Sequence, residues 1–361
     1  MDIAPAPQSS KRCSTKLSIA HAPRLALVIV LGCVLSACGG APDLLFSSDD
    51  GADCTSTLGV APEATGVFVE PDDGRDPVLD ELQAARCGID VSIYLLTDEI
   101  VIDELIASAR RGIQVRVMLE EHPFGGGGGQ EEVEAQLKAG GVEVRWSGSD
   151  IRFSHAKYVV VDRQVALILN QNLTNASFEG NREFGSITTE REAVLQAQEI
   201  FDADWAGEPI RDIDGPLIVS PTTSRSRYLD LIGGGRERID FYAEVIRDPE
   251  IIAALAAAEA RGVDVRLIVD GTLDEDQQET AAQLDERGVE IRLATGLYIH
   301  AKIMVIDGAS VIVGSQNFTK TSLDDNRELA MLVRDPLLVE RCVSVFERDW
   351  IRAEPGGTVD E

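Results

Sequence analysis

Two histidine–lysine pairs with the same spacing stand far apart in the chain. His155 is followed two residues later by Lys157, and His300 is followed two residues later by Lys302. An imidazole titrates near neutral pH, so one histidine can act as a nucleophile while the other acts as a protonated acid. A lysine ammonium can bind the oxygens on which negative charge gathers in a phosphate. The four residues therefore suit the transfer of a phosphodiester group, provided that the fold brings them together.

Further polar residues follow each pair at a fixed spacing. Asn172 and Asn317 each lie 17 residues after their histidine, and Glu183 and Glu328 each lie 28 residues after it. An asparagine amide can bind the non-bridging oxygens of a phosphate, and a glutamate can hold an imidazole N–H and so fix its tautomer. The spacing does not decide whether each glutamate serves the histidine of its own repeat or that of the other. A whole ordered set at identical spacing favours catalysis over a chance arrangement of surface residues.

An aspartate ends each of these segments, at Asp162 and at Asp307. If the segments are β-strands, alternate side chains share a face, which puts His155 and Lys157 on one face and Asp162 on the other. We therefore expect Asp162 and Asp307 to fix the end of the strand or to pair with a basic group elsewhere, and not to contact the imidazoles.

The elements that must position these residues are repeated as well, and a repeat is the first feature to look for in a sequence. Alternating β-branched segments predict strands, and Ala-, Glu- and Leu-rich segments between them predict helices. Strands that alternate with helices predict an α/β fold in each half. Two equivalent halves pack most simply about a pseudo-two-fold axis, which would bring both histidine–lysine pairs to one site. The matching segments are 89–98 with 239–248, 107–120 with 257–270, 140–146 with 287–293, and 201–205 with 346–350.

The same segments resemble the two HxKxxxxD…GSxN motifs of the phospholipase D superfamily, and the resemblance covers the chain from about residue 64 to 350. The second motif is complete, since Gly314 and Ser315 are both present. The first has Leu169 and Asn170 where glycine and serine are expected. Because leucine cannot adopt backbone angles reserved for glycine, we expect the first half-site to differ in shape from the second.

This resemblance implies two similar α/β halves, each a β-sheet flanked by helices, related by a pseudo-two-fold axis. It implies that His155 attacks phosphorus to give a covalent phosphohistidine and that His300 protonates the leaving alcohol, although near-symmetry makes either histidine a candidate nucleophile. Ser315 would belong to the structural part of the motif. No metal or cofactor is expected, because two lysines can do a metal's electrostatic work and no residue set has clear metal-ligand spacing. Both half-sites belong to one chain, so a monomer suffices for activity.

The N-terminal region indicates export. A basic start and a short apolar run predict a signal peptide over residues 1–37. The sequence that ends it resembles a bacterial lipobox, which implies lipidation of Cys38. Residues 38–62 are rich in Gly, Ala, Asp, Ser and Pro and predict a flexible tether. We therefore expect a protein held by its lipid on a membrane of the bacterial cell envelope, with a first half at 63–210 and a second at 211–355.

The remaining cysteines and one glycine run say less about function. Cys54, Cys87 and Cys342 can form one disulfide in an exported protein, but the sequence does not choose the pair. The glycine run at 125–129 lacks the lysine and the spacing of a phosphate-binding P-loop, so a surface loop is expected there.

Four functions fit these features. We expect first a phospholipase D-type hydrolase of glycerophospholipids, since the lipid anchor would place it beside that substrate. A nuclease of the same superfamily, a phosphatidyltransferase such as a cardiolipin synthase, and a tethered binding module with a dead site are the alternatives. The net charge of −29 repels polyanions and weighs against nucleic acid as a partner. The arginines available for a nuclease's basic groove are Arg145, Arg152, Arg182 and Arg327.

Overall fold

The computed structural model describes residues 65–124, 129–148, 151–210 and 215–356. The predicted signal peptide, the lipidation site, the tether and most of the glycine run lie outside these residues and stay predictions. Within the described ranges, no helix is both long and apolar enough to cross a membrane.

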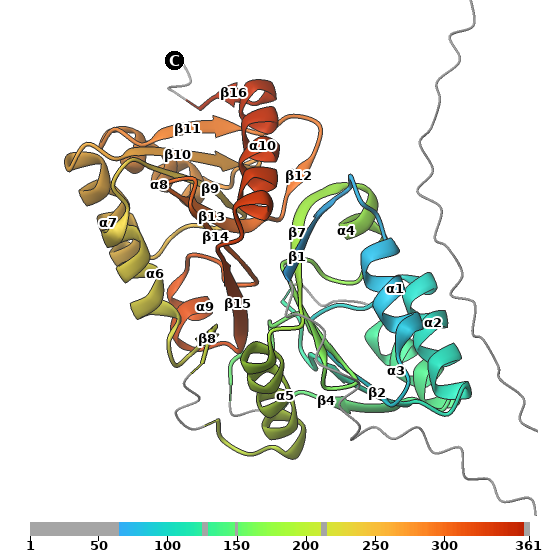
Figure 1. Ribbon diagram of the computed structural model, residues 1–361. Helices are drawn as coiled ribbons and strands as arrows, with labels where there is room; N and C mark the ends of the chain where they lie inside the picture. Colours follow the sequence, from blue (N-terminus) through green and yellow to red (C-terminus); the bar gives the residue numbers. More distant parts are fainter. Residues whose placement is uncertain (1–64, 125–128, 149–150, 211–214, 357–361) are drawn as a thin grey trace, which may run out of the picture. The chain divides into compact units, whose positions relative to one another are not determined.

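The first half is built on a mixed β-sheet whose strands follow the order β1-β7-β6-β5-β2-β3-β4. The strands β2, β3 and β4 are parallel, and the others pair antiparallel. Figure 1 shows α1 and α2 together over one face of this sheet. The strands are β1 (Thr65–Glu70), β2 (Gly88–Ile93), β3 (Gln114–Leu119), β4 (Glu143–Trp146), β5 (Tyr158–Val161), β6 (Val165–Leu169) and β7 (Asn181–Thr188). The helices are α1 (Asp76–Ala84), α2 (Glu99–Arg110), α3 (Gln130–Ala139), α4 (Asn175–Glu179) and α5 (Arg191–Ala206).

The second half repeats this plan in the order β16-β11-β10-β9-β13-β14-β15-β8. One short strand leaves it, since β12 pairs in parallel with β7 of the first half. The strands are β8 (Leu217–Ser220), β9 (Arg238–Ala243), β10 (Asp264–Val269), β11 (Glu290–Leu293), β12 (Tyr298–Ile299), β13 (Lys302–Ile306), β14 (Ser310–Gly314), β15 (Glu328–Val333) and β16 (Glu354–Pro355). The helices are α6 (Ser224–Gly234), α7 (Pro249–Ala260), α8 (Glu275–Asp285), α9 (Lys320–Asp324) and α10 (Pro336–Arg352). The two α/β halves predicted from the sequence are thus confirmed.

Three hydrophobic cores explain why the central strands are apolar on both faces. In β5, Val159 and Val161 join the core under α1, α2 and α3, whereas Tyr158 and Val160 face the opposite way. Tyr158 and Val160 belong to a shared core that also contains residues of α5, α10 and β13. A strand buried on both faces reads as a continuous apolar run, as "YVVV" does. The shared core joins the two halves, and its formation releases apolar surface of both from water.

Two buried ion pairs cross between the halves in a reciprocal way. The Nε of Arg182 donates to Asp349 at 2.7 Å, and the Nε of Arg327 donates to Asp204 at 2.9 Å. Arg182 and Arg327 are equivalent in the repeat, and so are Asp204 and Asp349. Each half therefore gives the other the same contact that it receives, as a pseudo-two-fold relation requires.

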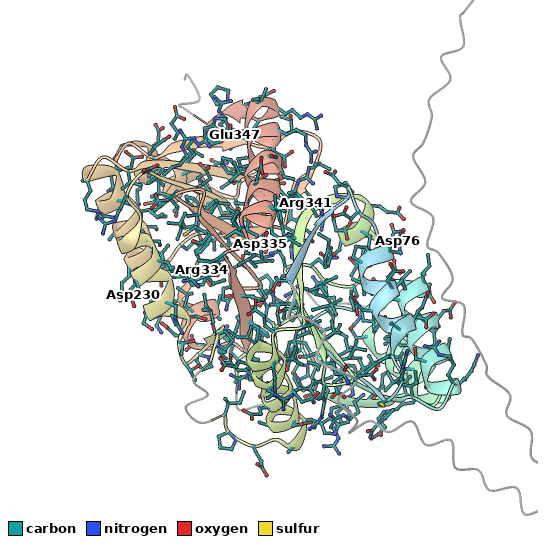
Figure 2. The ribbon with its side chains drawn as sticks, in the orientation of Figure 1. Asp76, Asp230, Arg334, Asp335, Arg341 and Glu347 are labelled. Atoms are coloured by element: carbon teal, nitrogen blue, oxygen red, sulfur yellow. The ribbon has the colours of Figure 1, made fainter. Side chains whose placement is uncertain are left out.

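Helix α10 adds a further link to the first half. Arg341, labelled on α10 in Figure 2, donates to the carbonyl oxygen of Val67 at 2.9 Å and also pairs with Asp73. Together with the reciprocal pairs, this contact fixes the last helix of the second half against the first strand of the first half.

The aspartates that end the two motifs secure the neighbouring strands. Asp162 accepts the backbone N–H groups of residues 86–88 at 2.7 to 2.9 Å, where β2 begins. Asp307 accepts those of residues 236–238 at 2.7 to 3.1 Å, where β9 begins. Both have positive φ, near 54°, which aspartate tolerates better than most residues. They lie at strand ends and act on backbone groups, as the sequence suggested.

We predict that Asp307→Asn will lower the free energy of unfolding by about 1–3 kcal/mol at pH 7, because a charged acceptor of several N–H groups is lost. Asparagine also tolerates positive φ, so backbone strain does not confuse the comparison. Burial alone would raise the pKa of Asp307, but the N–H groups of residues 236–238 outweigh it and lower that pKa. The contribution is therefore present above about pH 4 and is lost as the pH falls through the lowered pKa.

Chemical denaturation at pH 7 and at pH 3 measures this difference. Asp276→Asn is the matched control, since its side chain is 73% exposed and pairs only with Arg247 among the described residues. The assigned role would be contradicted if both substitutions lowered the free energy of unfolding equally. It would also be contradicted if the loss in Asp307→Asn were larger at pH 3 than at pH 7.

The two cysteines within the described ranges differ in state. Cys87 is disulfide-bonded, whereas Cys342 is a free thiol buried in the shared core. Burial raises the pKa of Cys342 to about 12, which makes this thiol unreactive near neutral pH.

Candidate active site

Backbone hydrogen bonds join each histidine–lysine segment to the opposite half. The N–H of His155 donates to the carbonyl oxygen of Arg327 at 3.0 Å. In the second half, β12 pairs with the start of β7, with Ile299 opposite Arg182. Since a glutamate directly follows each of these arginines in the sequence, the pairing carries each histidine to the glutamate of the other half.

Two histidine–glutamate dyads result, and both cross between the halves. The Nδ1 of His155 lies 2.9 Å from both carboxylate oxygens of Glu328, and the Nδ1 of His300 lies 2.8 Å from Glu183. Both glutamates are fully buried. A carboxylate at Nδ1 holds the proton there and leaves Nε2 free to exchange a proton or to attack. The structure thus decides the question that the spacing left open.

Each glutamate is itself held in place by an asparagine that the sequence analysis did not single out. The amide of Asn181 donates to Glu183 at 3.0 Å, and that of Asn326 donates to Glu328 at 3.0 Å. These residues open the repeated "NRE" strings, so their equivalence was visible in the sequence. Their role was not, because an amide two residues before a carboxylate reaches it only in a particular backbone conformation.

The two lysines stand where the strands begin, with Lys157 just before β5 and Lys302 at the first position of β13. The histidines therefore precede the regular strands, and the first strand begins later than the motif suggests. Both ammonium groups are fully buried, and each donates to the backbone carbonyl of its own histidine. Burial, aided by the nearby charge of Lys302, lowers the pKa of Lys157 to about 7.

The charges of the two half-sites act on one another. Burial lowers the pKa of His155, and the ammonium groups of Lys157 and Lys302 add to this effect against the pull of Glu328. Burial alone would raise the pKa of Glu328, but His155 and Lys157 outweigh it and lower that pKa.

Asn172 and Asn317 are less closely tied to this group. Both have a buried side-chain oxygen without a hydrogen-bond partner among the described residues. No hydrogen bond within those ranges joins either asparagine to the histidines or the lysines. Their role in binding phosphate oxygens therefore stays a prediction.

The first motif has Leu169 where the second has Gly314, and the structure shows why the second half requires a glycine at this position. Gly314 does not have positive φ, so its role is spatial: an added Cβ would lie 2.2 Å from the Cβ of Ala330 on the paired strand. In the first half, Leu169 pairs with Gly185, and the space beside Gly185 is filled by the ring of Phe68, which an added Cβ would approach to 2.1 Å. Because neither Gly314 nor Leu169 has positive φ, the expectation about backbone angles was wrong.

The serine-to-asparagine change adds a contact between the halves. The amide of Asn170 donates to the carbonyl oxygen of Gly314 at 3.0 Å. Ser315, its equivalent, instead bonds within its own half, where it accepts from the N–H of Leu329 at 3.2 Å. The departure thus strengthens the interface between the halves and leaves His155 and Lys157 intact.

Sequence reasoning missed one further pair of residues at the site, Tyr94 and Glu244. The ring of Tyr94 lies 4.6 Å from that of His155, and a carboxylate oxygen of Glu244 lies 2.6 Å from the Nζ of Lys302. They occupy the same position in the matching segments 89–98 and 239–248. Because their types differ, alignment of the repeats gave no signal that they belong to the site.

Three of the four arginines proposed for a nuclease groove contact other groups. Arg182 and Arg327 are buried and paired with Asp349 and Asp204, as described above. Arg145 packs its guanidinium over the ring of Trp205 at 4.6 Å and donates to that residue's carbonyl oxygen. Arg152 is exposed, with its guanidinium 5.5 Å from the centre of the Phe153 ring. Three of the four arginines are therefore held by other groups, which weakens the nuclease alternative. Across the described ranges, no group of three His, Cys, Asp or Glu side chains is placed to hold a metal ion.

Comparison with known families gives two matches, one for each half. The family described as "cardiolipin synthase, PLD-like domain" matches residues 78–205 and 228–350, which is more than half of the chain. The two matches contain both histidine–lysine pairs and both glutamates of the dyads.

Individual relatives agree with this result. The chain is 24% identical over 338 residues to a cardiolipin synthase of Geobacillus kaustophilus, covering 80% of this chain and 66% of the relative. It is 28% identical over 129 residues to a mitochondrial cardiolipin hydrolase of Chlamydomonas reinhardtii, covering 36% of this chain and 58% of the relative. The chain thus spans about two thirds or less of the length of these relatives.

A solved structure supports the fold. The phosphatidylserine synthase of Haemophilus influenzae superposes with a TM-score of 0.63 at 12% identity, covering 82% of this chain and 89% of that protein. At this level of identity, the likeness shows a common fold.

Proposed function

The chain belongs to the phospholipase D superfamily, within the family of cardiolipin synthase PLD-like domains, and from this premise we propose that it is a phosphatidyltransferase. It would move a phosphatidyl group from one phospholipid to the hydroxyl group of another, through a covalent phosphohistidine. The observation that carries the proposal is the pair of buried histidine–glutamate dyads contributed across the two halves.

The site residues suit a transfer in two displacements. A neutral imidazole, held by a glutamate at Nδ1, attacks phosphorus through Nε2 while the other imidazole protonates the departing alcohol. The second imidazole then takes the proton of the incoming hydroxyl group as that oxygen displaces the histidine. The two lysines stabilise the negative charge on the non-bridging oxygens. This electrostatic attraction is stronger in a buried site than in water.

Transfer to an alcohol is better supported than the hydrolysis that the sequence analysis placed first. The similarity to cardiolipin synthases extends over about four fifths of the chain.

Hydrolysis is the second candidate, favoured by the similarity of part of the chain to a cardiolipin hydrolase. The two reactions share every step up to the covalent intermediate and differ only in the acceptor. Lipidation of Cys38, which the sequence predicts, would hold the enzyme beside either lipid substrate.

Products from phosphatidylglycerol vesicles in excess chelator distinguish these functions, because this lipid carries both a phosphodiester and free hydroxyl groups. We expect cardiolipin and glycerol to form in equal amounts. Phosphatidic acid as the main product would identify a hydrolase, and nucleotide release from added DNA without lipid turnover would identify a nuclease. Absence of all three products would refute a phosphodiester-transferring function.

A further inference from the structure

The two half-sites differ at one pair of equivalent positions, and the difference changes the charge around each histidine. Tyr94 and Glu244 both directly follow the strand that pairs with the histidine–lysine strand, β2 in the first half and β9 in the second. The residues before the histidines differ as well, since Phe153 stands where the second half has Tyr298.

The surroundings of His155 on this side are aromatic. The ring of Tyr94 meets that of His155 edge-on at 4.6 Å and that of Phe153 at 6.3 Å. The Nζ of Lys157 lies 5.1 Å from the centre of the Tyr94 ring. Among the described residues, the only carboxylate paired with His155 is that of Glu328, at Nδ1.

The surroundings of His300 on this side are acidic. One oxygen of Glu244 lies 3.7 Å from the Nε2 of His300 and 2.6 Å from the Nζ of Lys302. The other accepts a hydrogen bond from the hydroxyl group of Tyr298 at 3.4 Å. With Glu183 at Nδ1, the imidazole of His300 therefore stands between two carboxylates.

This difference gives the two imidazoles unequal electrostatic surroundings. An adjacent carboxylate stabilises a charged imidazole, and an adjacent ammonium destabilises it. Two carboxylates lie within 4 Å of the ring nitrogens of His300, whereas His155 has one paired carboxylate, an aromatic wall and the repulsion of both lysines. Glu244 also acts on His155, but only through its charge and without an ion pair. Glu244 itself is ionised, because His300 and Lys302 outweigh the effect of burial and lower its pKa.

We propose that Glu244 is a positioning residue that keeps the proton on Nε2 of His300 and so supports the assignment implied by the resemblance, with His300 as the general acid and His155 as the nucleophile. This inference rests on the proposed function. In the first displacement, the lone pair on Nε2 of His155 forms the P–N bond as the P–O bond to the leaving alcohol breaks, and that oxygen takes the proton from Nε2 of His300. In the second, the acceptor hydroxyl returns a proton to His300 as its oxygen displaces His155.

A pair of matched lipids tests this role. Phosphatidylglycerol must have its leaving oxygen protonated, whereas the 4-nitrophenyl ester of phosphatidic acid releases a stable phenolate without a proton. We expect Glu244→Gln to slow the first-turnover release of glycerol by about 30- to 100-fold, within the range of general acid catalysis. Release of 4-nitrophenol should change less than about threefold. Glu244→Asp should restore most of the glycerol rate.

The control and the adduct complete the test. Asp230→Asn removes one charge from an exposed position of α6, labelled in Figure 2, and should leave both rates unchanged. In His300→Asn enzyme treated with the nitrophenyl lipid, mass spectrometry should find the phosphohistidine at residue 155.

The outcomes separate the two proposals. Equal slowing of both lipids in Glu244→Gln, no slowing of either, or release of 4-nitrophenol by His300→Asn enzyme without an adduct on His155 would overturn the role of Glu244 while the transferase function stands. Failure of the unmodified enzyme to release either leaving group would overturn both.

Discussion

His155→Asn and His300→Asn will each reduce steady-state turnover of phosphatidylglycerol by about 10³- to 10⁵-fold, the loss expected when a nucleophile or its acid partner is removed. The double variant should lose about as much turnover as either single variant, because the two residues act as one unit. This follows from the buried dyads, in which each histidine is held by a glutamate of the opposite half.

The measurement is product formation in vesicles, with the unfolding temperature of each variant recorded beside it. His122→Asn is the matched control, because the side chain of His122 is 83% exposed and lies outside both dyads. Substantial turnover in either single variant, or losses that multiply in the double variant, would show that the two histidines do not share one reaction.

Glu328→Gln and Glu183→Gln form the second pair of substitutions with a large expected effect. An amide can hold a proton at Nδ1 less well than a carboxylate and does not stabilise a charged imidazole, so turnover should fall about 10²- to 10⁴-fold in each. Glu328 also accepts from Asn326, and an amide in its place would disturb that bond. Replacement by aspartate should recover part of the rate if the charge matters.

Rates with the nitrophenyl lipid distinguish the two glutamates. Loss of Glu328 should slow the first release of 4-nitrophenol, since it acts on the nucleophile. Loss of Glu183 should slow the release of glycerol more than that of 4-nitrophenol, since it acts on the acid. Glu250→Gln, at a side chain that is 63% exposed, serves as the control. Identical behaviour of the two variants with both lipids would contradict the division of roles.

Much of this arrangement could be predicted from the sequence because the repeat exposes it. Periodicity showed two α/β halves, and equal spacing selected His155, Lys157, His300 and Lys302. Alternation of side chains along a strand predicted that Asp162 and Asp307 lie on the face opposite the imidazoles. The structure shows both aspartates bonded to backbone groups at strand ends.

What could not be predicted depends on how the halves meet. Which glutamate serves which histidine is set by β12 crossing to β7, and a two-residue strand has no sequence signature. The pairing of Leu169 with Gly185 depends on strand register, which no single segment reveals. Comparison of repeats also favours residues that match, so it passed over Tyr94 and Glu244, where the difference itself carries the information.

β12 crosses to the first half, and the segment that contains His155 crosses to the second. This reciprocal crossing affects which substitutions such a site can accept during evolution. Two separate, identical subunits would have to carry the same residue at both copies of every position, so a tyrosine on one side would force a tyrosine on the other. Fusion into one polypeptide removes that restriction. One copy can then specialise as the attacking partner and the other as the proton donor, without either losing the strand contacts that hold them together.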